Sequence, residues 1–229
     1  MLDNILIIGT SHISSNSLTL IKKSILEFKP DIIAVELDAD RLYGLQHPNN
    51  KNKSSIFSQI KQLGFSGFIF AHVGKFVQNK LGSIVKLKPG SDMLYAVKLA
   101  KNNNLQLELI DRHINITLKR FSKEFGFREK LRLIKDILLA PFSKKNKIKF
   151  DISKIPEDEL VSKLIEQVKY TYPSIHRVLI DERNKFMSKK LIILHKKNPN
   201  KKILAVVGAG HKIEMEKLIE KYNSSIELI

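Results

Sequence analysis

The sequence contains no cysteine and no tryptophan among its 229 residues, and only 7% of the residues are aromatic. The absence of cysteine excludes disulfide bonds, thiolate metal sites and a cysteine nucleophile, and it is typical of a protein that works in a reducing compartment. The shortage of aromatic residues leaves few side chains on which the bases of a single-stranded nucleic acid would stack.

No apolar run reaches the roughly 18 residues that a membrane-spanning helix requires, and the chain does not begin with the basic stretch of a secretion signal. We therefore expect a cytoplasmic location for the chain as it stands, and membrane anchoring only through a C-terminal transmembrane region outside it. The sequence also lacks a P-loop, a Gly-x-Gly-x-x-Gly fingerprint, a His-Glu-x-x-His motif and a Gly-x-Ser-x-Gly elbow. The sequence signatures of common nucleotide-binding proteins, zincins and serine hydrolases are thus absent.

Positive charge is in large excess, with 40 lysines and arginines against 23 acidic residues and a formal net charge of +17. Such a charge suits a nucleic acid, an anionic membrane surface or simply lysine-rich faces in contact with water. The lysines lie beside asparagines in the polar segments 49–53, 144–149 and 196–202. We therefore favour solvated faces over a nucleic-acid partner, and keep an anionic membrane surface as the alternative.

Apolar runs of strand length alternate with segments of helical periodicity, and 43% of the residues are hydrophobic, which is enough for a core. The runs predict strands at 4–9, 31–37, 105–110, 203–207 and 225–229. A helix ended by Pro30 connects the first two strands, and this strand–helix–strand unit predicts a parallel pair. We therefore predict an α/β fold with a central, mostly parallel sheet flanked by helices.

Helical patterns dominate the rest of the chain. Helices are predicted from Asp38, as N-cap, to Gln46, over 54–82, after Pro89 and through most of 123–172. We expect a single domain over residues 1–229, with a mainly helical insertion at about 113–200. The exposed helices of this insertion offer a surface for a homodimer.

A long helix is predicted from Pro173 to about Lys197. Its apolar stripe is expected to consist of Ile175, Leu179, Glu182 and Phe186. Because an unpaired charge on an apolar face is costly, Glu182 needs either a salt-bridge partner or a role in function. The arginines considered as partners are Arg41, Arg112 and Arg120.

Polar side chains gather where the predicted strands end, at the edge where open parallel sheets place their sites. They are His12, Glu36, Asp111, Arg112 and His211. Asp92, in the first turn of a predicted helix, and Glu182 add two further acids. The helix dipole alone would also favour an acid at position 92.

Two of these strands end in the same pattern, Gly-x-x-His. Gly9 precedes His12 near the start of the chain, and Gly208 precedes His211 near its end. We expect Gly9, Gly208 and Gly210 to permit tight turns that carry each histidine over the sheet edge. Two copies from opposite ends of the sequence predict one site built from both ends.

Two neutral imidazoles and one or two carboxylates suit a divalent metal such as Mn, Co or Zn, with one coordination position left open. Such a metal lowers the pKa of bound water and polarises a carbonyl group. A second carboxylate would act as a general base. Nearby arginines would hold the carboxylates in place or bind a developing oxyanion.

Six segments together resemble the TraB/PrgY family, which is related to the Tiki proteins and more distantly to the erythromycin-esterase/ChaN-like group. These segments are Gly9–His12, Pro30–Arg41, Ile110–Arg112, Thr117–Arg120, Asp181–Asn184 and Val206–His211. The resemblance covers nearly the whole chain. It implies a divalent-metal-dependent hydrolase of the peptidase type, acting on a peptide or protein.

Carried over to this sequence, the resemblance makes His12 and His211 metal ligands and Glu36 a ligand or a base. Gly90-Ser91-Asp92 stands where the family usually has Gly-x-Glu, so Asp92 takes the place of a glutamate, and its side chain is one methylene shorter. Together with the strand-end analysis, this gives a predicted catalytic and supporting set. That set is Glu36, Arg41, Asp92, Asp111, Arg112, Glu182 and Arg183.

Two alternatives to a hydrolase remain open at this point. The family includes regulators that limit peptide pheromones and members at membranes, so one alternative is a non-catalytic protein that sequesters a peptide, including at a membrane. The other is a nucleic-acid or phosphate-ester partner attracted by the net charge. It predicts an affinity that falls steeply with salt.

Overall fold

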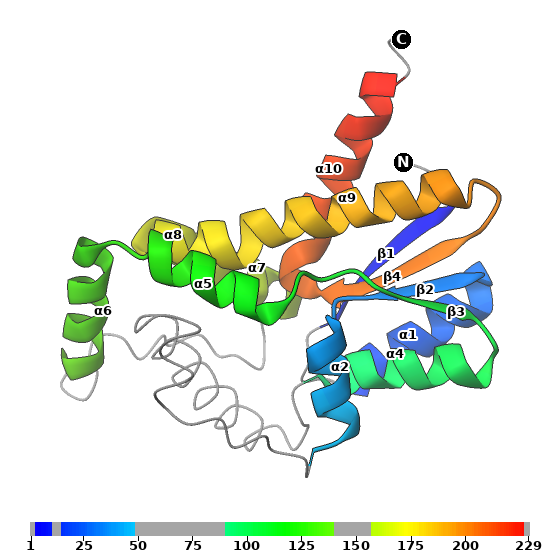
Figure 1. Ribbon diagram of the computed structural model, residues 1–229, viewed down its shortest axis with the longest axis horizontal. Helices are drawn as coiled ribbons and strands as arrows, with labels where there is room; N and C mark the ends of the chain where they lie inside the picture. The colour runs from blue at the N-terminus through cyan, green and yellow to red at the C-terminus, as the bar shows by residue number, and fades with distance from the viewer. Residues whose placement is uncertain (1–2, 11–14, 49–89, 140–156, 227–229) are drawn as a thin grey trace.

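The computed structural model describes residues 3–10, 15–48, 90–139 and 157–226. Its four strands form one sheet in the order β1-β4-β2-β3, and each neighbouring pair is parallel (Figure 1). The strands are β1 (Ile5–Thr10), β2 (Ile32–Val35), β3 (Gln106–Leu109) and β4 (Ile203–Gly208). The predicted α/β class with a central parallel sheet is confirmed.

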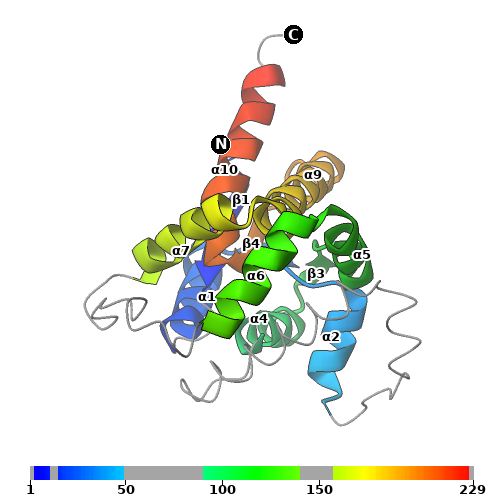
Figure 2. The ribbon, with the colours of Figure 1, turned by 90° about the vertical axis from the view of Figure 1, so that its left-hand side faces the viewer.

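Helices cover both faces of this sheet (Figures 1 and 2). On one face, Ile33 and Val35 of β2 pack with α1 (Ser15–Phe28) and α4 (Ser91–Asn102). On the other face, Ile32 and Ala34 pack with α9 (Glu182–Lys197) and α10 (Ala209–Ile226). This alternation explains why a four-residue strand that is buried on both faces is apolar throughout.

The helix boundaries follow local signals in the sequence. The backbone turns left-handed at Lys29, with φ of 51°, and Pro30 follows, so α1 ends at Phe28. Asp38 caps α2 (Ala39–Gln46) by accepting the backbone N–H groups of Asp40 and Arg41 at 2.9 and 3.0 Å. The predicted cap at Asp38 is confirmed.

Three further helices lie in the region predicted as an insertion. They are α5 (Ile114–Glu124), α6 (Phe127–Leu139) and α7 (Glu157–Thr171). The helical prediction therefore holds for the described part of this region, whereas its status as an insertion into one domain stays a prediction. The helix predicted over 54–82 lies outside the described residues.

The chain end differs from prediction, and the glycines at the strand ends lie within regular elements. The strand expected at 225–229 is wrong at its start, because α10 continues to Ile226 with Met215 and Ile219 packed in the core; 227–229 lie outside the described residues. At the second glycine pair, the chain passes directly from β4, which ends at Gly208, into α10, which begins at Ala209 and includes Gly210. Gly9 permits close packing, because a Cβ there would lie 3.0 Å from the Cα of Ala209.

A π turn interrupts the long helix that was predicted from Pro173 to Lys197. The helix α8 (Pro173–His176) runs through the π turn Arg177–Asp181 into α9, and the N–H of Glu182 bonds to the carbonyl of Arg177. The extra residue in this turn moves the buried face by one position. The predicted stripe is therefore wrong after the turn. The buried residues of α9 are Asn184, Met187, Ser188 and Leu191.

Among the described residues, no helix combines the length and the apolar character that crossing a bilayer would require.

Candidate functional site

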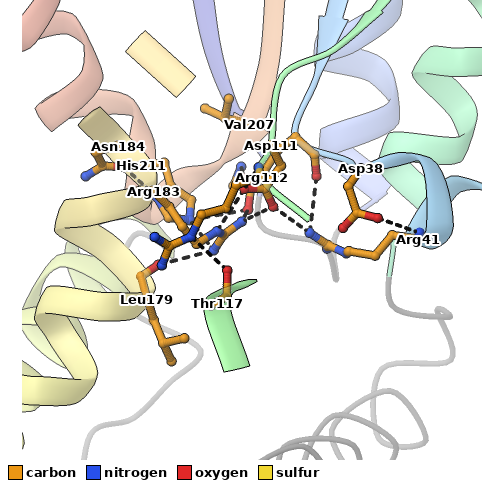
Figure 3. Close-up of polar contacts among 12 residues, drawn as sticks. Asp38, Arg41, Asp111, Arg112, Thr117, Leu179, Arg183, Asn184, Val207 and His211 are labelled. Carbon is orange, nitrogen blue, oxygen red and sulfur yellow. Dashed lines mark hydrogen bonds and ion pairs between the residues drawn. The ribbon is translucent and has the colours of Figure 1, made fainter. Parts of the chain in front are cut away.

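The polar side chains that follow three neighbouring strands meet at the carboxyl edge of the sheet (Figure 3). Glu36 follows β2, Asp111 follows β3, and His211 lies in the first turn of α10, directly after β4. All three are at most 5% exposed. We call this group, together with Arg183 of α9, the strand-end site. The sequence analysis predicted that Glu36, Asp111 and His211 would lie at one edge, and Arg183, which entered only through the family resemblance, connects all three.

Arg183 is the cation that joins these groups. One terminal nitrogen, Nη2, donates to Glu36 Oε1 and to Asp111 Oδ2, the latter at 2.8 Å. Its Nε donates to Asp111 Oδ1 at 3.1 Å, so the contact with Asp111 is bidentate. Its other terminal nitrogen, Nη1, lies 3.1 Å from His211 Nε2 and donates to the carbonyl of Leu179 at 3.2 Å.

Charge compensation keeps both members of the main ion pair ionised. Burial by itself raises the pKa of Glu36, but His211, Arg183 and the backbone N–H of Gly208 hold it well below its usual range. That N–H donates to Glu36 Oε2 at 2.6 Å and ties the ends of β2 and β4 together. Burial lowers the pKa of Arg183, but Glu36 and Asp111 more than offset this effect and raise it.

Asn184 orients the histidine. Its Oδ1 lies 2.6 Å from His211 Nδ1, and because an amide oxygen only accepts, Nδ1 carries the proton. The Nε2 atom of the ring faces Arg183 Nη1, 3.1 Å away, and Glu36 Oε1, 3.3 Å away. Asn184 is fully buried, and the sequence analysis did not place it in the site. The π turn brings Asn184 onto the buried face of α9, which the predicted spacing of the stripe did not include.

Arg41 closes the outer side of the site. Its Nη1 donates to Asp111 Oδ2 at 2.9 Å, and its side chain is 35% exposed, against 14% for Arg183. In the described parts of the chain, Nη1 is the only nitrogen of this guanidinium with a hydrogen-bond partner. Arg41 therefore presents donors without a partner among the described residues on the exposed side of the site.

Arg112 and Glu182 form a second network beside the strand-end site. Arg112 donates to Glu182 Oε2 at 2.8 Å, to Thr117 Oγ1 at 2.9 Å and to the carbonyl of Val178 at 2.8 Å. Arg120 donates to Glu182 Oε1 at 2.7 Å. Of the three arginines considered as partners for Glu182, two are thus confirmed. These contacts hold α5 against the π turn and give both side chains a structural role.

Asp92 of α4 contacts Thr10 at the end of β1, separately from the strand-end site. Thr10 donates through Oγ1 to Asp92 Oδ2 at 2.5 Å and to the carbonyl of Val207 at 3.2 Å. Asp92 is 2% exposed and lies in the first turn of α4, directly after Gly90, whose φ is 81°. His12 would follow β1 on the same edge, but it lies outside the described residues.

A sequence model of the TraB/PrgY/gumN family matches residues 3–224 of this chain. The chain belongs to the TraB/PrgY/gumN family. An uncharacterized protein of Methanocaldococcus jannaschii is 36% identical over 211 residues, which are 91% of this chain and 51% of that protein. The TraB domain-containing protein of Homo sapiens is 24% identical over 243 residues, which are 92% of this chain and 61% of that protein. The chain thus spans between half and two thirds of these relatives.

The metal that the TraB/PrgY resemblance implies can be compared with the donors of this site. His211 Nε2 and Glu36 Oε1 lie 3.3 Å apart, which is about the spacing of two ligands in a tetrahedral site with bonds of about 2.0 Å. The bond from Nδ1 to Asn184 is the support that metal-binding histidines usually have. No third His, Asp or Glu joins them within the described residues. The two donors have the spacing that a divalent cation would require, but the Arg183 guanidinium contacts both of them, and His12 is the sequence-based candidate for a third ligand.

Glu182 makes a prediction about acid stability possible. Hydrogen bonds from Arg120 lower its pKa, burial opposes them, and Arg112 lowers it further. A lowered pKa in the folded state stabilises the protein above the unfolded value of about 4.3. This contribution is lost as the pH falls through the folded pKa.

We expect Glu182→Gln to be less stable than the wild type at neutral pH and to approach it as the pH falls below 4, as an approximate limit. Urea unfolding between neutral and acidic pH measures this difference. Glu166→Gln replaces an exposed glutamate of α7 and serves as control. If the difference in free energy of unfolding between Glu166→Gln and the wild type shrinks by the same amount at acidic pH, the role given to Glu182 is contradicted.

Proposed function

We propose that this chain is a divalent-metal-dependent hydrolase that cleaves amide bonds of a peptide or protein at the strand-end site. The proposal is carried by one observation, the 3.3 Å separation of His211 Nε2 and Glu36 Oε1, with Asn184 holding the other nitrogen of the ring. His12 is proposed as the third ligand. A bound metal would supply Lewis acidity and a water of lowered pKa.

The other residues of the site have separate roles in this proposal. Asp111 accepts hydrogen bonds from Arg41 and Arg183, so it positions both arginines and is not available as a base. Arg41 has further donors on the exposed side of the site, where it would bind a substrate carboxylate or a developing oxyanion. Arg183 contacts both proposed ligands, so it competes with the metal for them and holds them in place without it.

We expect the wild type to bind about one Mn, Co or Zn ion per chain, and His211→Ala and His12→Ala to lose at least about tenfold in affinity. Metal analysis of the purified protein and calorimetric titration give this result without any assay of activity. His47→Ala removes an exposed histidine that stacks on Tyr43 and should bind metal as the wild type does. Equal metal binding by all four proteins would contradict the proposed ligands.

Catalysis needs a test of its own. A mixture of synthetic peptides is incubated with the metal-loaded protein and analysed by mass spectrometry. We expect cleavage that a chelator abolishes and that Glu36→Gln lacks. Metal binding without any cleavage would support the proposed ligands but reject the proposed hydrolase activity.

A second candidate is a protein that binds a peptide without cleaving it. It is supported by the charge balance of the site, because Arg183 and Arg41 already compensate both buried carboxylates. A site that is complete without a metal would bind a peptide carboxylate through Arg41. Peptide binding that persists in the presence of a chelator and disappears in Arg41→Ala would favour this candidate.

A further inference from the structure

A groove between α9 and the C-terminal half of α10 lies outside the strand-end site. Its volume is about 440 Å³. Its lining residues are Lys185, Ser188, Lys189, Ile192, Ile193 and Lys196 of α9 and Leu218, Lys221 and Tyr222 of α10. Figures 1 and 2 show that α10 extends beyond the other helices here. We call this feature the lysine groove.

The lysine groove has an apolar floor and a basic rim. The lining residues of α9 recur at helical spacing from Lys185 to Lys196, which corresponds to a length of about 16 Å. Ile192, Ile193 and Leu218 provide apolar surface, and Ile193 is 42% exposed. Four of the lining residues are lysines, and the described residues that line the groove include no acid.

Two hydroxyl groups of the groove lack partners. Ser188 Oγ and the Tyr222 hydroxyl are buried, and neither has a hydrogen-bond partner among the described residues. Buried polar groups are normally satisfied, so these two hydroxyls represent unused hydrogen-bonding capacity beside the groove. The Lys196 ammonium lies 5.1 Å from the centre of the Tyr222 ring and joins the two helices across the groove.

We propose that the lysine groove binds an acidic amphipathic helix of a partner protein. Apolar side chains of such a helix, spaced three and four residues apart, would enter the floor between α9 and α10. Its carboxylates would meet the lysines of the rim. The length of the groove corresponds to about three turns of helix.

Charge and shape distinguish this occupant from two others. A symmetric dimer through the groove would place the same four lysines of two chains opposite each other, which is unfavourable. A bilayer would need apolar side chains that protrude from the surface. Here Ile192 and Leu218 are half-buried between the two helices and Ile193 is the exposed one of the three, which suits a narrow, elongated ligand.

The test uses the whole chain and a fluorescent synthetic peptide of about 14 residues, with leucines on one helical face and glutamates on the others. A peptide of the same composition in permuted order is the matched probe. We expect the amphipathic peptide to bind with a micromolar Kd, and the permuted one at least about tenfold more weakly. Fluorescence anisotropy at physiological salt measures both.

Substitutions then locate the binding site. We expect Ile193→Glu and Lys189→Glu each to weaken binding at least about tenfold. Ile116→Glu on α5, where Ile116 is 52% exposed, and Lys98→Glu on α4 are matched controls that should bind like the wild type. All four positions are exposed, and circular dichroism confirms that each variant is folded.

Three outcomes would overturn the proposal. The first is that the permuted peptide binds as tightly as the amphipathic one, or that Ile193→Glu leaves the affinity for the amphipathic peptide unchanged. The second is co-sedimentation with phosphatidylserine vesicles that Ile193→Glu abolishes, which would assign the groove to a membrane. The third is a dimer in gel filtration that Ile193→Glu dissociates, which would assign it to a second copy of the chain.

Discussion

Replacement of Arg183 by methionine is expected to lower the free energy of unfolding by about 3–5 kcal/mol. Methionine fills a similar volume but leaves Glu36 without its arginine and Asp111 with Arg41 alone. The Glu36 and Asp111 side chains are 5% and 3% exposed, so water does not replace the lost donors. Urea unfolding followed by circular dichroism measures the loss.

Two comparisons make the Arg183 result specific. Arg177→Met breaks an ion pair with Glu124 in which the arginine is 53% exposed, and it should cost at most about 1 kcal/mol. Adding Glu36→Gln to Arg183→Met should recover part of the loss, because a buried charge is removed along with its partner. A double variant no more stable than Arg183→Met would show that Arg183 acts through packing.

Deletion of Ile180 is the second change for which we expect a large effect. It converts the π turn into regular α-helix and rotates α9 by about 100° relative to α8. Before the deleted position, Val178 of the π turn packs with Phe121 and Phe125; after it, Met187 packs in the sheet core. Only one of these packings survives the rotation, so we expect a loss of about 4 kcal/mol or more.

Ile180→Ala is the matched control for the deletion, because it removes the same side chain and keeps the number of residues. Ile180 is half-buried, so the substitution should cost about 1–2 kcal/mol. Metal titration of both variants adds a second readout, since the rotation also displaces Arg183 and Asn184. A deletion that costs no more than the alanine substitution would contradict the importance of the extra residue.

The sheet and its helices could be predicted because their signals are local. A strand buried on both faces, such as β2, is apolar at every position, and Pro30 and Asp38 mark helix boundaries by their own chemistry. The strand ends also located the site, because parallel strands bring Glu36, Asp111 and His211 to one edge of the sheet.

The side-chain contacts within the site depend on which residues of α9 face the core, and the spacing of apolar residues in the sequence does not reveal this. Leu179 predicts Glu182 as the next residue of the stripe, whereas the π turn brings Asn184 to the core. The sequence signal that could have placed Asn184 in the site is its helical spacing from the apolar residues Met187 and Leu191. The separation of Arg112 and Glu182 from Arg183 likewise depends on how α5 packs against the turn.

The position of β4 in the sheet has a consequence for synthesis on the ribosome. Within the described sheet, β1 pairs only with β4, which lies near the end of the chain and between β1 and β2. Of the described strands, β1 is synthesised first, and it can form hydrogen bonds to a neighbouring strand only after β4 has been synthesised. Until β4 emerges, the apolar edge of β1 is exposed to other chains and to chaperones. His211, the third residue of α10, can join Glu36 only after β4 has been synthesised.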